Sequence, residues 1–397
     1  MDRGETNLED GTQCNPTSAR MWGVLKNPLS ATFHSQFSIF FPIMALISGE
    51  VLMFFNRRLL GPWLVLSTVL LVFLTAIACG GGTGGGGGYN PPPSPPPPST
   101  TYNTTEVAVS AVKMVYDPSR NRIYASVSNT DSAHPNTVAV IDVASSSLVT
   151  TIAVGDSPRV VRLSDDYKNL YVGVDGTGEV KKIDLSTNSV VQAFPVAPSG
   201  NFGRVMAGDI SVMPGKPDTV AVAWKYDGLA NNGGVAIYDN GVQRPVTSNP
   251  SLVGGPDIIT FGTSADTIYA ADTSVSDFSL IRMSVSADGV TVADRKYSMF
   301  GFAYYFEMLF DSGRLYSSTG AVADADALDL VGTFDGIGSV AVDSPTKSAW
   351  FLSGSSNSGT NKKIFNLSQF DTDTFLLKGT QQAEVPSSVQ SASNLLH

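Results

Sequence analysis

From about residue 104 onward, short apolar runs alternate with polar turns along the chain. The runs are rich in Val, Ile, Tyr and Thr, and the turns are rich in Gly, Asp, Asn, Ser and Pro. The apolar positions lack the 3.6-residue period that amphipathic helices would produce. This pattern is typical of short β-strands, and it predicts an all-β domain over residues 104–397.

The β-rich region contains an internal repeat. In one strand of each unit an apolar residue is followed by an aromatic or small residue, at intervals of about 47, 50, 48, 47 and 34 residues. The pairs are Ile123-Tyr124, Leu170-Tyr171, Val220-Ala221, Ile268-Tyr269, Leu315-Tyr316 and Ala349-Trp350. A period near 45 residues with four short strands is the length of one propeller blade. We therefore predict a β-propeller in which each blade packs against its neighbours.

The number of blades has two interpretations. First-strand segments number seven if the tail 386–397 is counted, because Val389 follows Pro386 at the spacing of the earlier units. This favours a seven-fold arrangement with an incomplete last blade, to which TEVAV at 105–109 would give the outer strand. Such a blade would lack about two strands, which predicts an incomplete reading frame and an open, poorly stable ring. Six blades with the tail as coil is the alternative.

The segment 117–174 resembles the YVTN-type β-propeller repeat. The likeness is carried by Tyr171-Val172, by the strand ending in Val140-Ile141-Asp142, and by the turn from Gly155 to Pro158. It fades in later units, since the third has the insertion KYDGLANNGG and the fifth lacks an Ile-Asp corner. The resemblance implies the propeller fold but names no ligand.

Two residue types recur within the repeat, and both have structural explanations. We expect the corner aspartates to cap β-turns through their own carboxylates; they are Asp142, Asp184 and Asp239. We expect the recurring tyrosines to be half-buried between blades and not to form a binding stripe; they are Tyr124, Tyr171, Tyr269 and Tyr316.

An apolar run, residues 59–78, ends at Cys79. Residues 74–79 resemble the bacterial lipobox, in which the cysteine is lipidated and becomes the mature N-terminus. Arg57-Arg58 before the run fits a signal peptide at 53–78. An uncleaved membrane helix is the alternative, since about 20 apolar residues can cross a bilayer. The resemblance implies a lipid anchor on Cys79 and a lipoprotein of the cell envelope.

The segments around the signal peptide complete the domain organisation. Residues 1–52 do not fit the signal-peptide pattern, and we interpret them as a doubtful leader that arises from a mis-called start. Residues 79–103 form a predicted flexible linker, a glycine coil followed by a polyproline stretch. Gly80 stands where an aspartate would often indicate retention at the inner membrane, so the resemblance implies the outer membrane of a two-membrane bacterium.

Composition excludes several kinds of site. Residues 104–397 contain no cysteine, which excludes disulfides and thiolate chemistry there. A histidine-based metal cage or catalytic triad would depend on His134, which we expect to be a solvated loop residue. Residues 1–78 carry five basic and five acidic side chains, so the net charge of −10 also applies to the rest of the chain. We therefore expect no nucleic-acid partner.

Candidate ligand-binding residues come from the alignment of the repeats. Arg159, Asp209 and Asp257 stand at equivalent starts of the first strands, facing one mouth of the predicted channel. They would hold a cation or polar ligand, or, in the ordinary alternative, pair with one another and with backbone amides. The group Asp324, Asp326 and Asp329 resembles a calcium loop only in charge density, because the glycine and closing glutamate are missing. We predict no catalytic residue, bound metal or cofactor.

These observations favour a non-enzymatic module, a monomer anchored to the membrane by its lipid. It would bind an unidentified protein or glycan, or act as a scaffold in the cell envelope. The alternative is a metal-dependent hydrolase of the lactonase type that some propellers resemble, acting in the central channel. That activity needs acidic and amide side chains without a neighbouring arginine, and Arg159 counts against it. Fold analogy alone does not choose between these functions.

Overall fold

The computed structural model describes residues 37–39, 44–48, 100–102, 105–197, 203–227, 232–248, 255–274, 278–356, 362–386 and 391–396. All of them belong to one compact unit, residues 1–49 together with 98–397. The predicted signal peptide and Cys79 lie outside the described residues. The described residues form strands and turns but no helix. Accordingly, no helix in this part of the chain is long and apolar enough to span a membrane.

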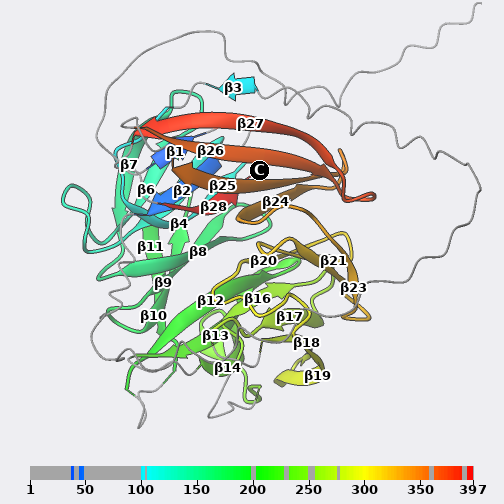
Figure 1. The fold of residues 1–397 in the computed structure, drawn as a ribbon. Helices are drawn as coiled ribbons and strands as arrows, with labels where there is room; N and C mark the ends of the chain where they lie inside the picture. The colour runs from blue at the N-terminus through cyan, green and yellow to red at the C-terminus, as the bar shows by residue number, and fades with distance from the viewer. Residues whose placement is uncertain are drawn as a thin grey trace, which may run out of the picture. The chain divides into compact units, whose positions relative to one another are not determined.

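Four-stranded antiparallel sheets follow one another along the described chain, and the strands pair in sequence order in each (Figure 1). Blade one contains β4 (Ala111–Asp117), β5 (Arg122–Val127), β6 (Thr137–Asp142) and β7 (Ser147–Ala153). Blade two contains β8 (Pro158–Leu163), β9 (Asn169–Val174), β10 (Glu179–Asp184) and β11 (Ser189–Pro195). Blade three contains β12 (Val205–Met213), β13 (Lys216–Tyr226), β14 (Asn232–Asp239) and β15 (Val242–Gln243).

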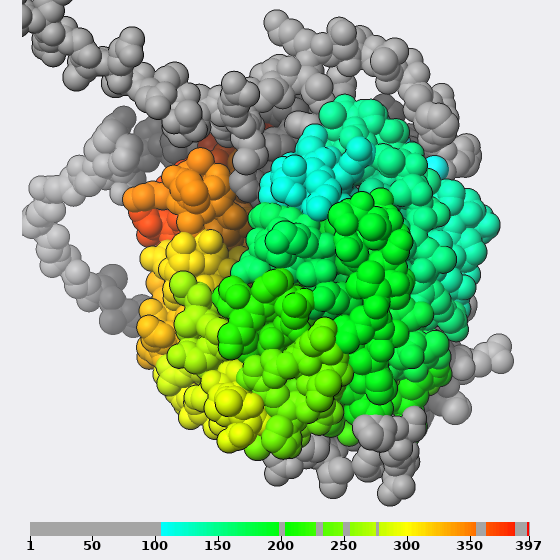
Figure 2. All heavy atoms as spheres, turned by 180° about the vertical axis from the view of Figure 1, so that it is seen from behind, coloured from blue at the N-terminus to red at the C-terminus, as the bar shows by residue number. Residues whose placement is uncertain are grey.

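Blades four to six repeat the same order. Blade four contains β16 (Ile258–Phe261), β17 (Thr267–Ala271), β18 (Ser279–Ser286) and β19 (Gly289–Tyr297). Blade five contains β20 (Met308–Asp311), β21 (Arg314–Ser317), β22 (Ala321–Asp324) and β23 (Leu330–Thr333). Blade six contains β24 (Ser339–Asp343), β25 (Ser348–Ser356), β26 (Lys362–Asp371) and β27 (Leu377–Pro386). In Figure 2 the colour runs in chain order around the visible face, from cyan through green to yellow and orange.

A further strand, β28 (Ser391–Leu396), lies between blade six and blade one. It contacts β24 and β4, and it pairs with β2 (Met44–Ser48), which in turn pairs with β1 (Phe37–Ile39). Leu395 joins the apolar cluster of blade six, and Leu396 packs against the cluster of blade one. The tail is therefore a strand and not the coil that the six-blade alternative assumed.

The blade count agrees with the six-blade alternative. In the described part of the chain six sheets contain four consecutive strands, and the sheet with β28 has three. The seven-fold arrangement of like blades is not formed. The outer strand predicted at 105–109 is also wrong, because Val107 and Val109 are buried in the core of blade one. Instead β3 (Thr100–Tyr102), within the predicted linker, pairs in parallel with β27 of blade six.

The second strand of each blade explains why the repeat was visible in the sequence. Ile123 and Ala125 of β5 pack in the core of blade one, whereas Tyr124 packs with Val161 and Leu170 of blade two. Successive side chains of a strand point to opposite faces. Because both faces of β5 are buried, its sequence is a nearly continuous apolar run without polar alternation.

The recurring tyrosines pack between blades, as predicted, and they are more deeply buried than we expected. Tyr124, Tyr171, Tyr269 and Tyr316 are all buried. Tyr171 of blade two also donates its hydroxyl to the carbonyl oxygen of Pro217 in blade three, at 2.8 Å. Burial raises the pKa of Tyr171, so the hydroxyl keeps its proton for this bond.

The corner aspartates cap turns, as the repeat predicted. Oδ1 of Asp142 accepts from the backbone N–H of Ser145, and Oδ1 of Asp184 accepts from that of Ser186, both at 2.7 Å. Asp239 differs, because it binds Arg244 at 2.7 Å. The corner of blade five, which the sequence did not reveal, is Asp324, whose Oδ1 accepts from the N–H of Ala327 at 2.7 Å.

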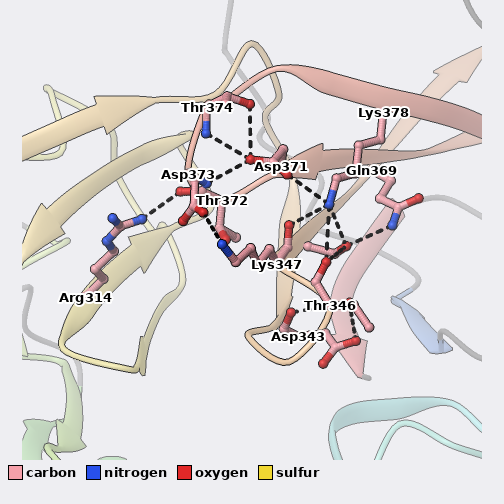
Figure 3. Close-up of polar contacts among 11 residues, drawn as sticks. Arg314, Asp343, Thr346, Lys347, Gln369, Asp371, Thr372, Asp373, Thr374 and Lys378 are labelled. Carbon is pink, nitrogen blue, oxygen red and sulfur yellow. Dashed lines mark hydrogen bonds and ion pairs between the residues drawn. The ribbon is translucent and has the colours of Figure 1, made fainter.

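Figure 3 shows the corner network of blade six in close-up. Oδ1 of Asp371 accepts from the N–H groups of Asp373 and Thr374, at 3.0 and 2.9 Å. Lys378 pairs with Asp371 at 3.1 Å and donates to the carbonyl oxygen of Lys347 at 2.7 Å. These bonds hold the pKa of Asp371 well below its usual range. Arg314 of blade five donates to the carbonyl oxygen of Thr372 at 2.6 Å and so links the two blades.

Candidate functional site

A cavity of about 760 Å³ lies where the first strands of the blades converge. Its wall includes residues of β4, β8, β12, β16, β20, β24 and β28. The first strands of consecutive blades contact one another from β4 to β20, so they surround the centre of the ring. The cavity therefore corresponds to the channel in which the repeat alignment placed the candidate residues.

Arg159, Asp209 and Asp257 all line this cavity. The three side chains are in one place because the repeat sets them at equivalent positions of consecutive blades. They do not bond directly to one another in the described contacts. Each has its own set of partners, as the following contacts show.

Arg159 on β8 connects blade two to blade three. Its Nε forms an ion pair with Oδ2 of Asp175 at 3.0 Å, and its Nη2 donates to the carbonyl oxygen of Ala207 at 3.0 Å. Burial raises the pKa of Asp175, against the opposing effect of the Arg159 charge. Arg159 is thus both a wall of the cavity and a link between blades.

Asp209 on β12 is a structural junction of three blades. Its Oδ1 pairs with Nη2 of Arg162 at 2.7 Å, and its Oδ2 accepts from the backbone N–H of Ile259 at 3.1 Å. Asp209 therefore bonds to a side chain and a backbone amide, but its side-chain partner is Arg162 and not Arg159 or Asp257. Sequence alignment missed Arg162 because it stands three positions beyond the aligned Arg159.

Asp257 lies immediately before β16. Oδ1 accepts from the backbone N–H of Thr273 and Oδ2 from its Oγ1, both at 2.8 Å. Burial raises the pKa of Asp257 to about 6, and the nearby charge of Asp272 acts in the same direction. A carboxylate can accept about four hydrogen bonds. The contacts with Thr273 therefore leave acceptor capacity for a ligand.

Lys225, near the end of β13, is a cavity residue that the repeat did not indicate. The positive charge of Arg159, followed by burial, lowers the pKa of Lys225, and Asp175 and Asp257 act in the opposite direction. Among the described residues, none forms an ion pair or hydrogen bond with its ammonium group. Lys225 is the first residue of the KYDGLANNGG insertion, which departs from the repeat pattern.

A loop between β19 and β20 carries three exposed aromatic rings, one of which reaches the same cavity. Phe302, Tyr304 and Tyr305 are 79%, 55% and 73% exposed, and Tyr305 lines the cavity. Below them lies the buried Phe278, with ring centroids 5.7 Å from Phe302 and 4.9 Å from Tyr304. The sequence FGFAYYF did not identify this loop, because a run of aromatic residues is equally typical of a buried strand.

The other sequence candidates do not form a site. Asp324 caps its turn, and Asp329 pairs with Lys296. The backbone N–H of His134 donates to Oδ1 of Asp131 at 2.7 Å, which fixes a polar loop. Within the described ranges, no group of three His, Cys, Asp or Glu side chains is arranged to hold a metal ion.

Comparison with solved structures agrees with this architecture. The β-propeller domain of Cps50 (Swd1) from Myceliophteria thermophila aligns with a TM-score of 0.52 and 12% identity, over 71% of this chain and 88% of that chain. The fold is a β-propeller. Hydrazine synthase of Kuenenia stuttgartiensis aligns over 72% of the propeller chain and 86% of its own, with a TM-score of 0.48 and 15% identity.

Similarity to the Swd1 propeller at 12% identity shows the fold alone, since one fold supports many functions. The propeller sequence matches no protein-family model, and a comparison with curated proteins gives no match. The YVTN repeat type therefore stays a prediction from residues 117–174. The function has to be argued from the cavity itself.

Proposed function

We propose that this propeller is a binding module that takes its ligand in the central cavity, between Lys225 and Asp257, and that a lipid on Cys79 holds it in the cell envelope. The observation that supports the binding role is the state of Lys225. Lys225 lines the cavity, and its ammonium group has no ion-pair partner among the described residues. The neighbouring cations are bonded, Arg159 to Asp175 and Arg162 to Asp209.

The size and lining of the cavity support the same proposal. Small-molecule sites usually measure about 300–1,000 Å³ and combine apolar walls with a few convergent polar groups. This cavity has about 760 Å³, with Met114, Val160 and Leu309 among its apolar residues. Asp257 supplies an acceptor and Lys225 a donor. Thr273 fixes the carboxyl group of Asp257, and strands of several blades form the surrounding wall.

A ligand that binds only the folded protein adds about 2.7 kcal/mol to the free energy of unfolding when its concentration is 100 times Kd. The melting temperature of the protein rises as a result. We would expose the full chain in detergent to size fractions of a bacterial envelope extract and record melting curves. One fraction should stabilise the wild type but not Lys225→Met. The matched control is Lys216→Met, at the exposed opposite end of the same strand. Equal stabilisation of both variants, or no stabilising fraction, would contradict the binding role.

The lipid anchor is supported by the lipobox-like residues 74–79 and needs its own test. Cells fed a labelled fatty acid should label the wild-type protein and release it only with detergent. Cys79→Ser should remove the label and prevent processing. Cys14→Ser is the control, since that second cysteine lies in the doubtful leader. Unchanged labelling of Cys79→Ser would exclude the anchor. No specific observation favours the hydrolase alternative.

A further inference from the structure

We infer that the ligand of this cavity is an uncharged saccharide, whose ring stacks on the loop Gly301–Tyr305 while its hydroxyl groups reach Lys225 and Asp257. This inference rests on the proposed binding role and adds the ligand class. It depends on three observations: the exposed aromatic rings of the loop, the hydrogen bonds that link the loop backbone to Asp257 through Thr273, and the balance of charge around the cavity.

The first observation is the exposure of three aromatic rings on one short loop. Phe302, Tyr304 and Tyr305 are more than half exposed, although aromatic side chains gain stability chiefly by burial. Isolated exposed apolar residues need no explanation, whereas clustered ones indicate an interaction site. The flat apolar faces of sugar rings stack on such side chains, and the tyrosine hydroxyl remains available to a sugar hydroxyl.

The second observation is that the loop is held in a costly backbone conformation beside the polar groups. Tyr305 has φ of 56°, in the left-handed region that bulky residues rarely adopt. Such strain is energetically unfavourable and concentrates at functional sites. The backbone N–H of Tyr305 donates to the carbonyl oxygen of Thr273 at 2.9 Å. Since Thr273 also binds Asp257, one residue positions both the aromatic loop and the carboxylate.

The third observation is the balance of charge. Lys113, Arg159, Arg162 and Lys225 line the cavity together with Asp209, Asp257 and Glu307. Asp175, bonded to Arg159, supplies the fourth negative charge. A balanced wall does not select a charged ligand, and the net charge of −10 on the chain opposes a polyanion. Hydroxyl groups both donate and accept, so they suit an ammonium group and a carboxylate together.

The test measures binding of the full chain in detergent to an array of neutral glycans, with maltotetraose and tetra-N-acetylglucosamine followed by calorimetry. Tetragalacturonate represents acidic saccharides, and a random peptide library represents peptides. Phe302→Ala and Tyr305→Ala should each weaken the bound neutral saccharide by about tenfold. Tyr297→Ala is the control, because Tyr297 is 59% exposed at the end of β19, just before the aromatic loop. This substitution should leave the affinity for the saccharide unchanged.

Several outcomes would overturn the saccharide inference. They are binding of tetragalacturonate or peptides in place of neutral glycans, no neutral glycan bound at millimolar concentration, and equal loss in Tyr297→Ala. The proposed function can be separated from it. If an envelope fraction stabilises the wild type but not Lys225→Met, while Phe302→Ala and Tyr305→Ala respond normally, the cavity binds a ligand and the saccharide inference is wrong. Saccharide binding that survives Lys225→Met would instead contradict the proposed use of the cavity.

Discussion

Lys113 and Glu307 join the first blade to the fifth at the cavity, with 3.1 Å between Nζ and Oε1. They are 194 residues apart in the sequence. Blades one and five are not consecutive, so this pair connects parts of the ring that the repeat itself does not bring into contact. The side chains are 36% and 27% exposed, and solvent therefore weakens the attraction between them.

A double-mutant cycle with Lys113→Met and Glu307→Gln measures this pair. Because both partners are partly exposed, we expect a coupling free energy of about 0.5–1 kcal/mol from urea unfolding. The reference is the exposed pair Lys347 and Asp373 in blade six, whose side chains are 65% and 52% exposed. Its coupling free energy should be smaller. If the coupling free energy of Lys113 and Glu307 is no larger than that of the reference pair, the cavity does not protect their ion pair from solvent.

Asp257→Asn should change how stability depends on pH. The pKa of Asp257 is about 6 in the folded protein, above the usual 3.8, so the folded state keeps its proton to higher pH than the unfolded state. Its contribution to stability is therefore highest below about pH 4 and falls as the pH rises through about 6.

The variant should consequently be more stable than the wild type above about pH 7, by at most about 3 kcal/mol, and equal to it near pH 4. Lost attraction to Lys225 reduces this gain, and Asp272 remains as a neighbouring charge. Urea unfolding at a series of pH values tests the prediction. A difference between variant and wild type that does not depend on pH would mean that Asp257 titrates normally.

Gly338→Ala should be strongly destabilising. Gly338 has φ of +122°, and a Cβ there would lie 2.0 Å from the carbonyl oxygen of Leu352 in blade six. Backbone strain and the steric conflict together should cost about 2–5 kcal/mol in thermal or urea unfolding. Gly379→Ala is the comparison, since a Cβ at Gly379 would meet nothing within 4 Å. A loss below about 1 kcal/mol for Gly338→Ala would contradict the described backbone.

Tyr171→Phe removes one hydrogen bond between blades and keeps the ring. The carbonyl oxygen of Pro217 would lose the hydroxyl that now lies 2.8 Å away, which should cost about 1–2 kcal/mol. Tyr297→Phe, on an exposed outer strand, should stay within about 0.5 kcal/mol of the wild type. Equal stability of Tyr171→Phe and Tyr297→Phe would show that the hydroxyl contributes nothing to blade packing.

The blade repeat could be predicted because a second strand that is buried on both faces has a continuous apolar sequence, as around Ile123 and Tyr124. The blade count could not be settled in the same way. The tail strand β28 has the mostly polar start SASN, and its partner β2 stands more than three hundred residues earlier in the chain. β3 is a similar case, because three residues of a linker carry no pattern that would indicate parallel pairing with β27.

The candidate site was predictable only where the repeat determines position. Arg159, Asp209 and Asp257 share a place in their blades, so aligning the units brought them to one cavity. Lys225 is the first residue of the KYDGLANNGG insertion, near the end of a second strand, and Tyr305 is in a connecting loop. Neither position recurs from blade to blade, and no period in the sequence could show that these side chains face the same cavity.

In the loop that connects blades four and five, the side chains of Phe300 and Phe306 pack against each other. Both are buried, and their rings meet edge to face with centroids 5.5 Å apart. Between them the loop Gly301–Tyr305 exposes the side chains of Phe302, Tyr304 and Tyr305, while Phe300 and Phe306 fix its two ends. Substitutions at exposed positions of such a loop usually change stability by less than about 0.5 kcal/mol. Natural variation or directed evolution could therefore retarget this surface to other ligands without having to rebuild the ring that supports it.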